Sequence, residues 1–152
     1  MQHVWIFQLA TAPSSSAKSS ILAELDAFIA VWKAHGSPVP GVSEMRYDRF
    51  VIVQAEPGHA SGCSIDAMTK GVNDILARHA VATLGPERIC FKEADGSIAD
   101  IDFKEAKGAI LSGRLQADST IFDSTMGQSN DLGRWEVPLQ ASWMGRFLPQ
   151  RA

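Results

Sequence analysis

The chain has 152 residues, 45% of them hydrophobic and 20% charged, and a formal net charge of -3. This length and composition are typical of a globular chain that buries its own core, so we expect one domain over residues 1–152. The slightly acidic balance provides no concentrated Lys/Arg surface for phosphates, which argues against nucleic acid as a partner.

The chain carries no sign of export or of a metal site. Residues 1–7 lack the basic and long apolar regions of a signal peptide, and no apolar run reaches membrane-spanning length, so we expect a cytoplasmic protein with no membrane partner. Two cysteines, Cys63 and Cys90, with four scattered histidines do not give a zinc-ligand spacing. We therefore expect no metal, no cofactor and, in a reducing compartment, no disulfide.

The first half of the chain predicts two strands and two long helices. Residues 4–9 mix β-branched, aromatic and aliphatic side chains, which indicates a buried first strand. A serine-rich loop follows, and helical spacing then predicts a first helix from about residue 21 to Gly36. A Pro- and Gly-rich connection leads into a strand over residues 46–53, which we expect at the centre of the sheet because its end is continuously apolar. A second amphipathic helix is predicted over residues 65–80.

The second half of the chain predicts a hairpin and shorter elements. Two alternating stretches, 88–94 and 97–103, flank Asp95-Gly96, a strong hairpin signal. The remaining predicted elements are a short helix within 104–116, strands over 120–123 and 134–139 separated by a polar loop, and a segment over 141–148 that packs on the core. This order predicts an α+β domain with a mixed sheet of about five to six strands and two long helices and one short helix packed against it.

Five blocks of sequence carry a resemblance; they are Trp32–Gly36, Arg49–Val53, Ser61–Asp66, Ser142-Trp143 and Arg146-Phe147. Together they resemble an uncharacterised family of small bacterial proteins, common in the Bacteroidetes, whose members carry the label "ABC transporter ATPase". The resemblance implies a bacterial protein and no established activity. The label itself fails a chemical test, since no segment matches the G-x-x-x-x-G-K-[ST] loop that such ATPases use to hold phosphates. We therefore reject nucleotide hydrolysis.

A polar turn before the second helix is the best candidate site. A thiol in the first turn of a helix meets unpaired N–H groups and the positive end of the helix dipole, which favour thiolate and could hold an anion. Gly62 permits close approach of a ligand to the backbone, whereas the carboxylate of Asp66 opposes a second anion. We expect this turn to bind a small polar or anionic ligand, or a protein partner, through the residues Ser61, Gly62, Cys63, Ser64, Asp66 and Arg49.

One alternative is a cysteine-dependent enzyme. Cys63 would be the nucleophile, His59 or His35 the base, and the N–H groups at the helix start an oxyanion site. His59 precedes the cysteine by four residues in a loop, whereas His35 is expected at the end of the first helix.

The other alternative is structural. Ser61 or Cys63 would then cap the helix, Asp66 would be the first-turn acid, and Cys63 would be a small buried residue. The protein would be an interaction module without a small-molecule site, acting through exposed apolar residues. A homo-oligomer that buries Trp143 and Phe147 is one form of this alternative.

Overall fold

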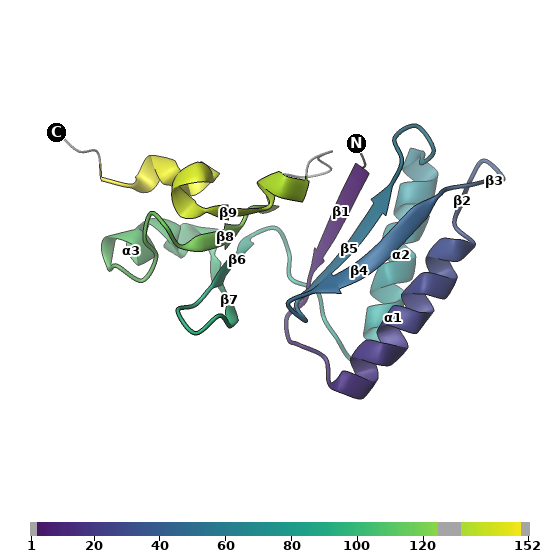
Figure 1. The fold of residues 1–152 in the computed structure, drawn as a ribbon, viewed down its shortest axis with the longest axis horizontal. Helices are drawn as coiled ribbons and strands as arrows, with labels where there is room; N and C mark the ends of the chain where they lie inside the picture. Colours follow the sequence, from purple (N-terminus) through teal and green to yellow (C-terminus); the bar gives the residue numbers. More distant parts are fainter. Residues whose placement is uncertain (1–2, 125–131, 150–152) are drawn as a thin grey trace. The chain divides into compact units, whose positions relative to one another are not determined.

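The computed structural model describes residues 3–124 and 132–149, which form two compact units. Unit 1 comprises residues 3–84, and unit 2 comprises residues 85–124 and 132–149. The α+β class is confirmed, with two long α-helices and one short one among these residues (Figure 1). The expected single sheet is wrong in detail, because the described strands form three small antiparallel sheets, and the apolar residues form two separate cores. The assignment of the whole chain to one domain stays a prediction.

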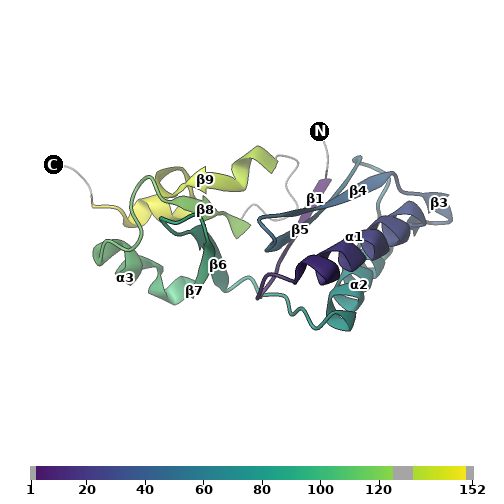
Figure 2. The same cartoon turned by 60° about the horizontal axis from the view of Figure 1, so that its bottom comes forward.

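Unit 1 is a three-stranded sheet with two helices on one face. Its elements are β1 (His3–Gln8), α1 (Ser15–Ala30), β2 (Lys33–Ala34), β3 (Ser37–Pro38), β4 (Gly41–Arg46), β5 (Phe50–Ala55) and α2 (Gly62–Arg78). The strand order is β1-β5-β4, with Trp5 opposite Val53 and Met45 opposite Val51. β1 and β4 therefore run in the same direction with β5 between them, a split β-α-β arrangement. The expectation that the apolar strand is central is confirmed for this sheet, and Figure 2 shows both helices on the same side of it.

The core of unit 1 lies between this sheet and the helices. α1 contributes Ile21, Leu25 and Ile29, which are spaced by four residues and so share one face. α2 contributes apolar residues at similar spacing, and alternate residues of β1 and β5, such as Trp5 and Val53, meet them from the sheet. Burial of these three apolar surfaces against one another is what holds the helices on the sheet.

The first helix begins earlier and ends earlier than the sequence predicted. Ser14 caps it, because its hydroxyl accepts a hydrogen bond from the amide of Ala17 at 3.2 Å, so the serine run belongs to the helix start rather than to a loop. The helix ends at Ala30, and the chain then forms the β2–β3 hairpin. His35 and Gly36 make its two-residue turn, and both are left-handed, with φ values of 52° and 80°. A helix that ended at Gly36 would need a left-handed conformation at the glycine alone.

The segment before the central strand is also revised. The prolines indicated a rigid connection, but residues 41–46 form the strand β4, and a tight turn separates it from β5. Tyr47 and Asp48 both have a φ of 55°, and the amide of Arg49 donates to the carbonyl of Arg46 at 3.1 Å. The predicted strand over residues 46–53 therefore begins at Phe50, because its first four residues belong to this turn or to the strand before it.

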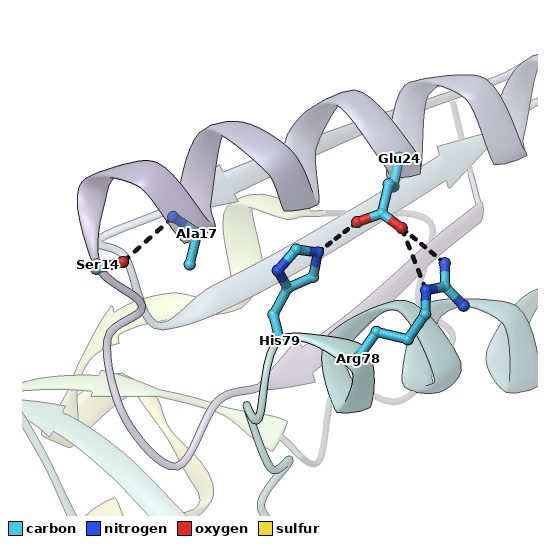
Figure 3. A network of polar contacts seen from close by, with 5 residues as sticks. All are labelled: Ser14, Ala17, Glu24, Arg78 and His79. Atoms are coloured by element: carbon cyan, nitrogen blue, oxygen red, sulfur yellow. Dashed lines mark hydrogen bonds and ion pairs between the residues drawn. The ribbon is translucent and has the colours of Figure 1, made fainter.

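A carboxylate of α1 ties the two helices together (Figure 3). Glu24 accepts two hydrogen bonds from Arg78, at 3.2 Å from Nε and 2.8 Å from Nη2, and a short contact joins its other oxygen to Nε2 of His79. The contact with His79 and then the bonds from Arg78 lower the pKa of Glu24 from its ordinary value. The charged carboxylate of Glu24 thus holds the C-terminal end of α2 against α1.

After α2 the chain pairs briefly with the end of β1 and the residues that follow it. The amide of Ala10 donates to the carbonyl of Ala82 at 2.8 Å, the amide of Leu84 donates to the carbonyl of Gln8 at 2.7 Å, and Leu9 and Thr83 form an isolated antiparallel bridge. Continued in the same register, Pro86 would lie opposite Ile6. Proline has no N–H to donate there, which gives a physical reason for the pairing to stop.

Unit 2 is a four-stranded antiparallel sheet with a short α-helix and short 3-10 helices. Its elements are β6 (Arg88–Lys92), β7 (Ile98–Asp102), η1 (Phe103–Glu105), α3 (Ala106–Leu111), β8 (Thr120–Phe122), η3 (Leu132–Arg134), β9 (Glu136–Pro138), η4 (Leu139–Ala141) and η5 (Trp143–Phe147). The strand order is β7-β6-β8-β9, and the Asp95-Gly96 hairpin is confirmed, with Gly96 at a φ of 86°. Part of the predicted polar loop before β9 lies outside the described residues.

The core of unit 2 forms on the η5 side of its sheet. Ile89 and Phe91 of β6 point into it, Ile110 of α3 covers them, and Met144 anchors η5. Trp143 and Phe147 pack on this core while remaining partly exposed, as the sequence predicted. Within the described residues, no helix combines the length and apolarity that crossing a membrane requires.

Candidate functional site

The predicted site turn is a helix cap whose two serines bond to each other. Ser61 is the N-cap of α2, and its hydroxyl accepts a hydrogen bond from the amide of Ser64 at 3.4 Å. The hydroxyl of Ser64 accepts a bond from the amide of Ser61 at 2.7 Å and lies 2.9 Å from the carbonyl of Ser61, to which it donates. This reciprocal pair is a capping box, so both hydroxyls are committed to the start of the helix.

The cap is also fastened to the core of unit 1. Ser64 is buried, and its carbonyl accepts a hydrogen bond of 2.8 Å from the indole Nε1 of Trp32. Trp32 in turn makes an edge-to-face contact with Trp5, with ring centroids 5.8 Å apart. The turn is therefore held from beneath by aromatic side chains, which accounts for the sequence pattern without a ligand.

The rest of the turn faces solvent. Cys63 is a free, exposed thiol, which overturns the expectation of a small buried residue in the structural alternative. Asp66 is exposed and lies beyond the first turn of α2, so it is not the first-turn acid; Ser64 takes the capping partner's position instead. At Gly62 an added Cβ would meet no atom within 4 Å, so the surface is open there.

The predicted partners of this turn are divided between different places in unit 1. His59 lies in the loop before α2, exposed, with its Nε2 3.6 Å from Oε2 of Glu56. His35 lies at the tip of the β2–β3 hairpin and is exposed. Arg49 precedes β5 and donates from Nε to the carbonyl of Leu9 at 2.9 Å. The six residues of β5, about 20 Å of extended chain, separate Arg49 from the turn that follows this strand.

Cys63, His35 and His59 are all exposed in the structure. Within residues 3–124 and 132–149, no hydrogen bond joins Cys63 to His35 or His59. Binding at the turn and nucleophilic catalysis by Cys63 both stay predictions.

The described residues hold no obvious metal site. No group of three or more His, Cys, Asp or Glu side chains that could hold a metal ion occurs among them. Asp100 forms an ion pair with Arg88 across the β6–β7 hairpin, at 2.8 Å, and this hydrogen bond raises the pKa of Arg88. The two strands are joined by a charge pair at this position.

Comparisons with known proteins add no assignment. No protein-family model, no curated protein and no solved structure matches this chain. The resemblance to the small bacterial family stays a prediction.

A pocket in unit 2 is a concave feature that the sequence analysis did not predict. It has a volume of about 220 Å³, and its lining residues are Pro86, Ile89, Phe103, Ser124 and Trp143. They come from the loop before β6, from β6, from η1, from the segment after β8 and from η5, so positions up to 57 residues apart in the sequence converge. Phe103 remains 49% exposed, and one serine hydroxyl is the polar side chain of the lining.

The side chain of Arg146 lies beside the pocket residue Trp143. The guanidinium of Arg146 lies 5.4 Å from the ring centre of Trp143 and 5.0 Å from that of Phe147. Both aromatic residues belong with Arg146 to η5, and Ser142 caps this 3-10 helix by accepting a bond from the amide of Met144 at 3.2 Å. The sequence placed Trp143 and Phe147 on the core or in an oligomer interface, and it gave Arg146 no role of its own.

Proposed function

We propose that this protein is a binding protein and that unit 2 takes an apolar ring of its ligand into the pocket between Phe103 and Trp143. The observation that carries the proposal is the shape and chemistry of this pocket. Binding sites for small molecules are concave and mostly apolar, with few polar groups that fix orientation. Four apolar lining residues and one serine match that composition.

The volume indicates the size of the group. Cavities of about 150 Å³ lined by apolar side chains can bind benzene. The pocket, at about 220 Å³, has room for one six-membered ring and a short substituent. It is smaller than the roughly 300–1,000 Å³ of sites for drug-sized ligands, so one ring rather than a fused system is expected.

Exposure of Phe103 supports the same site. A phenylalanine that is 49% exposed leaves apolar surface in water, which is unfavourable by roughly 25 cal/mol for each Å². Its backbone is fixed, because its amide donates to the carbonyl of Glu87 at 2.8 Å and Asp102 caps η1. The ring is thus presented at the pocket by ordered backbone, and an apolar ligand would cover part of it.

The test uses 3-phenylpropanamide, an uncharged single-ring probe, with saturation-transfer NMR on the full chain. We expect transfer from the protein to the phenyl protons, lost when Ser124→Phe fills the pocket from its rim. Leu111→Ser, which removes an exposed apolar side chain outside the lining, is the control and should leave the transfer unchanged. Absence of transfer with the unaltered protein, or equal transfer with Ser124→Phe, contradicts the proposal.

A further inference from the structure

We infer that the ligand of this pocket carries a carboxylate beside its apolar ring and that Arg146 binds the carboxylate. This inference rests on the proposed function, since it concerns the same pocket. It begins from two arginines in the described part of unit 2, Arg146, which lies over Trp143 and Phe147, and Arg114, which lies over Phe91 at 5.2 Å.

The two arginines differ in their charge partners. Nη2 of Arg114 lies 3.1 Å from a carboxylate oxygen of Glu93, so its charge is compensated within the chain. For Arg146 the described residues provide two aromatic rings and no carboxylate within 4.0 Å. A stacked guanidinium still has its planar edge of N–H donors available, and this edge matches a carboxylate with two parallel hydrogen bonds.

The secondary structure places this charge next to the pocket. In a 3-10 helix, side chains three residues apart lie one above the other, so Trp143 and Arg146 of η5 share one face. Trp143 lines the pocket, and Arg146 lies on its ring. Met144, fully buried, holds η5 on the core and keeps this pair in place. A ring in the pocket with a short acidic chain therefore brings its carboxylate toward Arg146.

The aromatic rings favour an anionic partner for Arg146. They replace water on one face of the guanidinium, and a less hydrated guanidinium is better suited to pairing with an anion. An aliphatic or aromatic ring would bury against Ile89 and Trp143, while the acid stays near the rim. The ligand class is therefore an aryl- or cycloalkyl-substituted short-chain carboxylic acid.

The experiment compares 3-phenylpropionate with 3-phenylpropanamide, which differ in charge and hardly in size. Dissociation constants come from chemical-shift titrations of the full chain. We expect the acid to bind more tightly than the amide, and Arg146→Gln to weaken the acid by about threefold or more while changing the amide by less than about twofold. Arg114→Gln is the matched control and should leave both constants unchanged.

The outcomes separate this inference from the proposed function. Loss of preference for the acid in Arg146→Gln alone supports the inference. The inference is overturned if Arg114→Gln weakens binding of the acid as much as Arg146→Gln does, or if Arg146→Gln keeps the preference for the acid over the amide. If the amide still binds in that case, the proposed function stands. Failure of both probes to bind the unaltered protein overturns both.

Discussion

At the scale of single residues, the turn before α2 contains residues that cap the helix and residues that are exposed to solvent. Ser61 and Ser64 bond to each other and hold the helix start, whereas Cys63 and Asp66 face solvent. The sequence identified the polar turn, but it did not say which residue is the capping partner. That depends on where the helix begins, and a shift of two or three residues changes every role in the motif.

Replacement of Ser64 by alanine tests the capping role. We expect Ser64→Ala to lower the free energy of unfolding by about 1–2 kcal/mol, because it removes the bond to the amide of Ser61 from a buried position. Cys63→Ser, one residue earlier and exposed, should change it by less than about 0.5 kcal/mol. Urea unfolding followed by circular dichroism measures both. A larger effect from Cys63→Ser than from Ser64→Ala would contradict this division of roles.

The Glu24 carboxylate gives a pH-dependent prediction. Its pKa lies below the ordinary value of 4.5 in the folded chain, so it favours folding above the unfolded-state pKa, and this contribution is lost as pH falls through the lowered pKa. Glu24→Gln should therefore lower Tm at pH 7, and the difference from the unaltered protein should narrow below about pH 4.

Asp74→Asn is the control for this pH series, because the ion pair of Asp74 with Lys70 lies on the exposed surface of α2 and joins two residues of the same helix. It should leave Tm nearly unchanged at neutral pH. Thermal scans between pH 3 and pH 7 measure the differences. A constant Tm difference for Glu24→Gln over that range would show that the side chain acts through packing rather than charge.

At the scale of elements, α2 ends without the glycine that its geometry favours. The amide of Val81 donates to the carbonyl of Leu76 at 3.0 Å and that of Ala80 to Ala77 at 3.0 Å, the two bonds of a Schellman ending. Ala80 occupies the left-handed position with a φ of 57°. An alanine there is strained because its Cβ approaches the backbone.

Relief of that strain is measurable. Ala80→Gly should raise the free energy of unfolding by about 0.5–1 kcal/mol, whereas Ala67→Gly, an exposed interior position of the same helix, should lower it by about 1 kcal/mol. The opposite signs exclude a general effect of glycine on the unfolded chain. Urea unfolding gives both values, and a loss of stability in Ala80→Gly would contradict the strained ending.

The elements also show what local pattern can and cannot predict. Helical spacing located both long helices and the Asp-Gly pair located the β6–β7 hairpin, because those signals lie within a few neighbouring residues. The end of α1 was wrong by six residues. The apolar side chains Trp32 and Val39 beyond it do bury in the same core, but from a hairpin rather than a helix.

At the scale of the whole molecule, two apolar cores serve two units. Unit 2 has about 60 described residues, and a domain of that size buries only about 60% of the surface that its unfolded chain exposes, so it is marginally stable alone. The assignment of residues 1–152 to one domain therefore stays a prediction, and from it we expect the chain to unfold cooperatively.

Matched core substitutions test that cooperativity. Leu25→Ala in unit 1 and Leu115→Ala in unit 2 each remove a buried side chain and should each cost about 2–5 kcal/mol. We expect both to shift one common transition in calorimetry. Two separate transitions, with each variant moving a different one, would show that the units unfold independently.

The sequence by itself determined the α+β class, the apolar faces of the helices, the central strand of the first sheet and the position of the polar turn. These follow from periodicity and turn chemistry, which act between near neighbours in the chain. Only the tertiary structure decided which core each element joins, that Arg49 and the turn lie beyond opposite ends of β5, and that Phe103 and Trp143 line the same pocket. Such features depend on which distant faces pack together, and residues far apart in sequence carry no local pattern that fixes their distance in space.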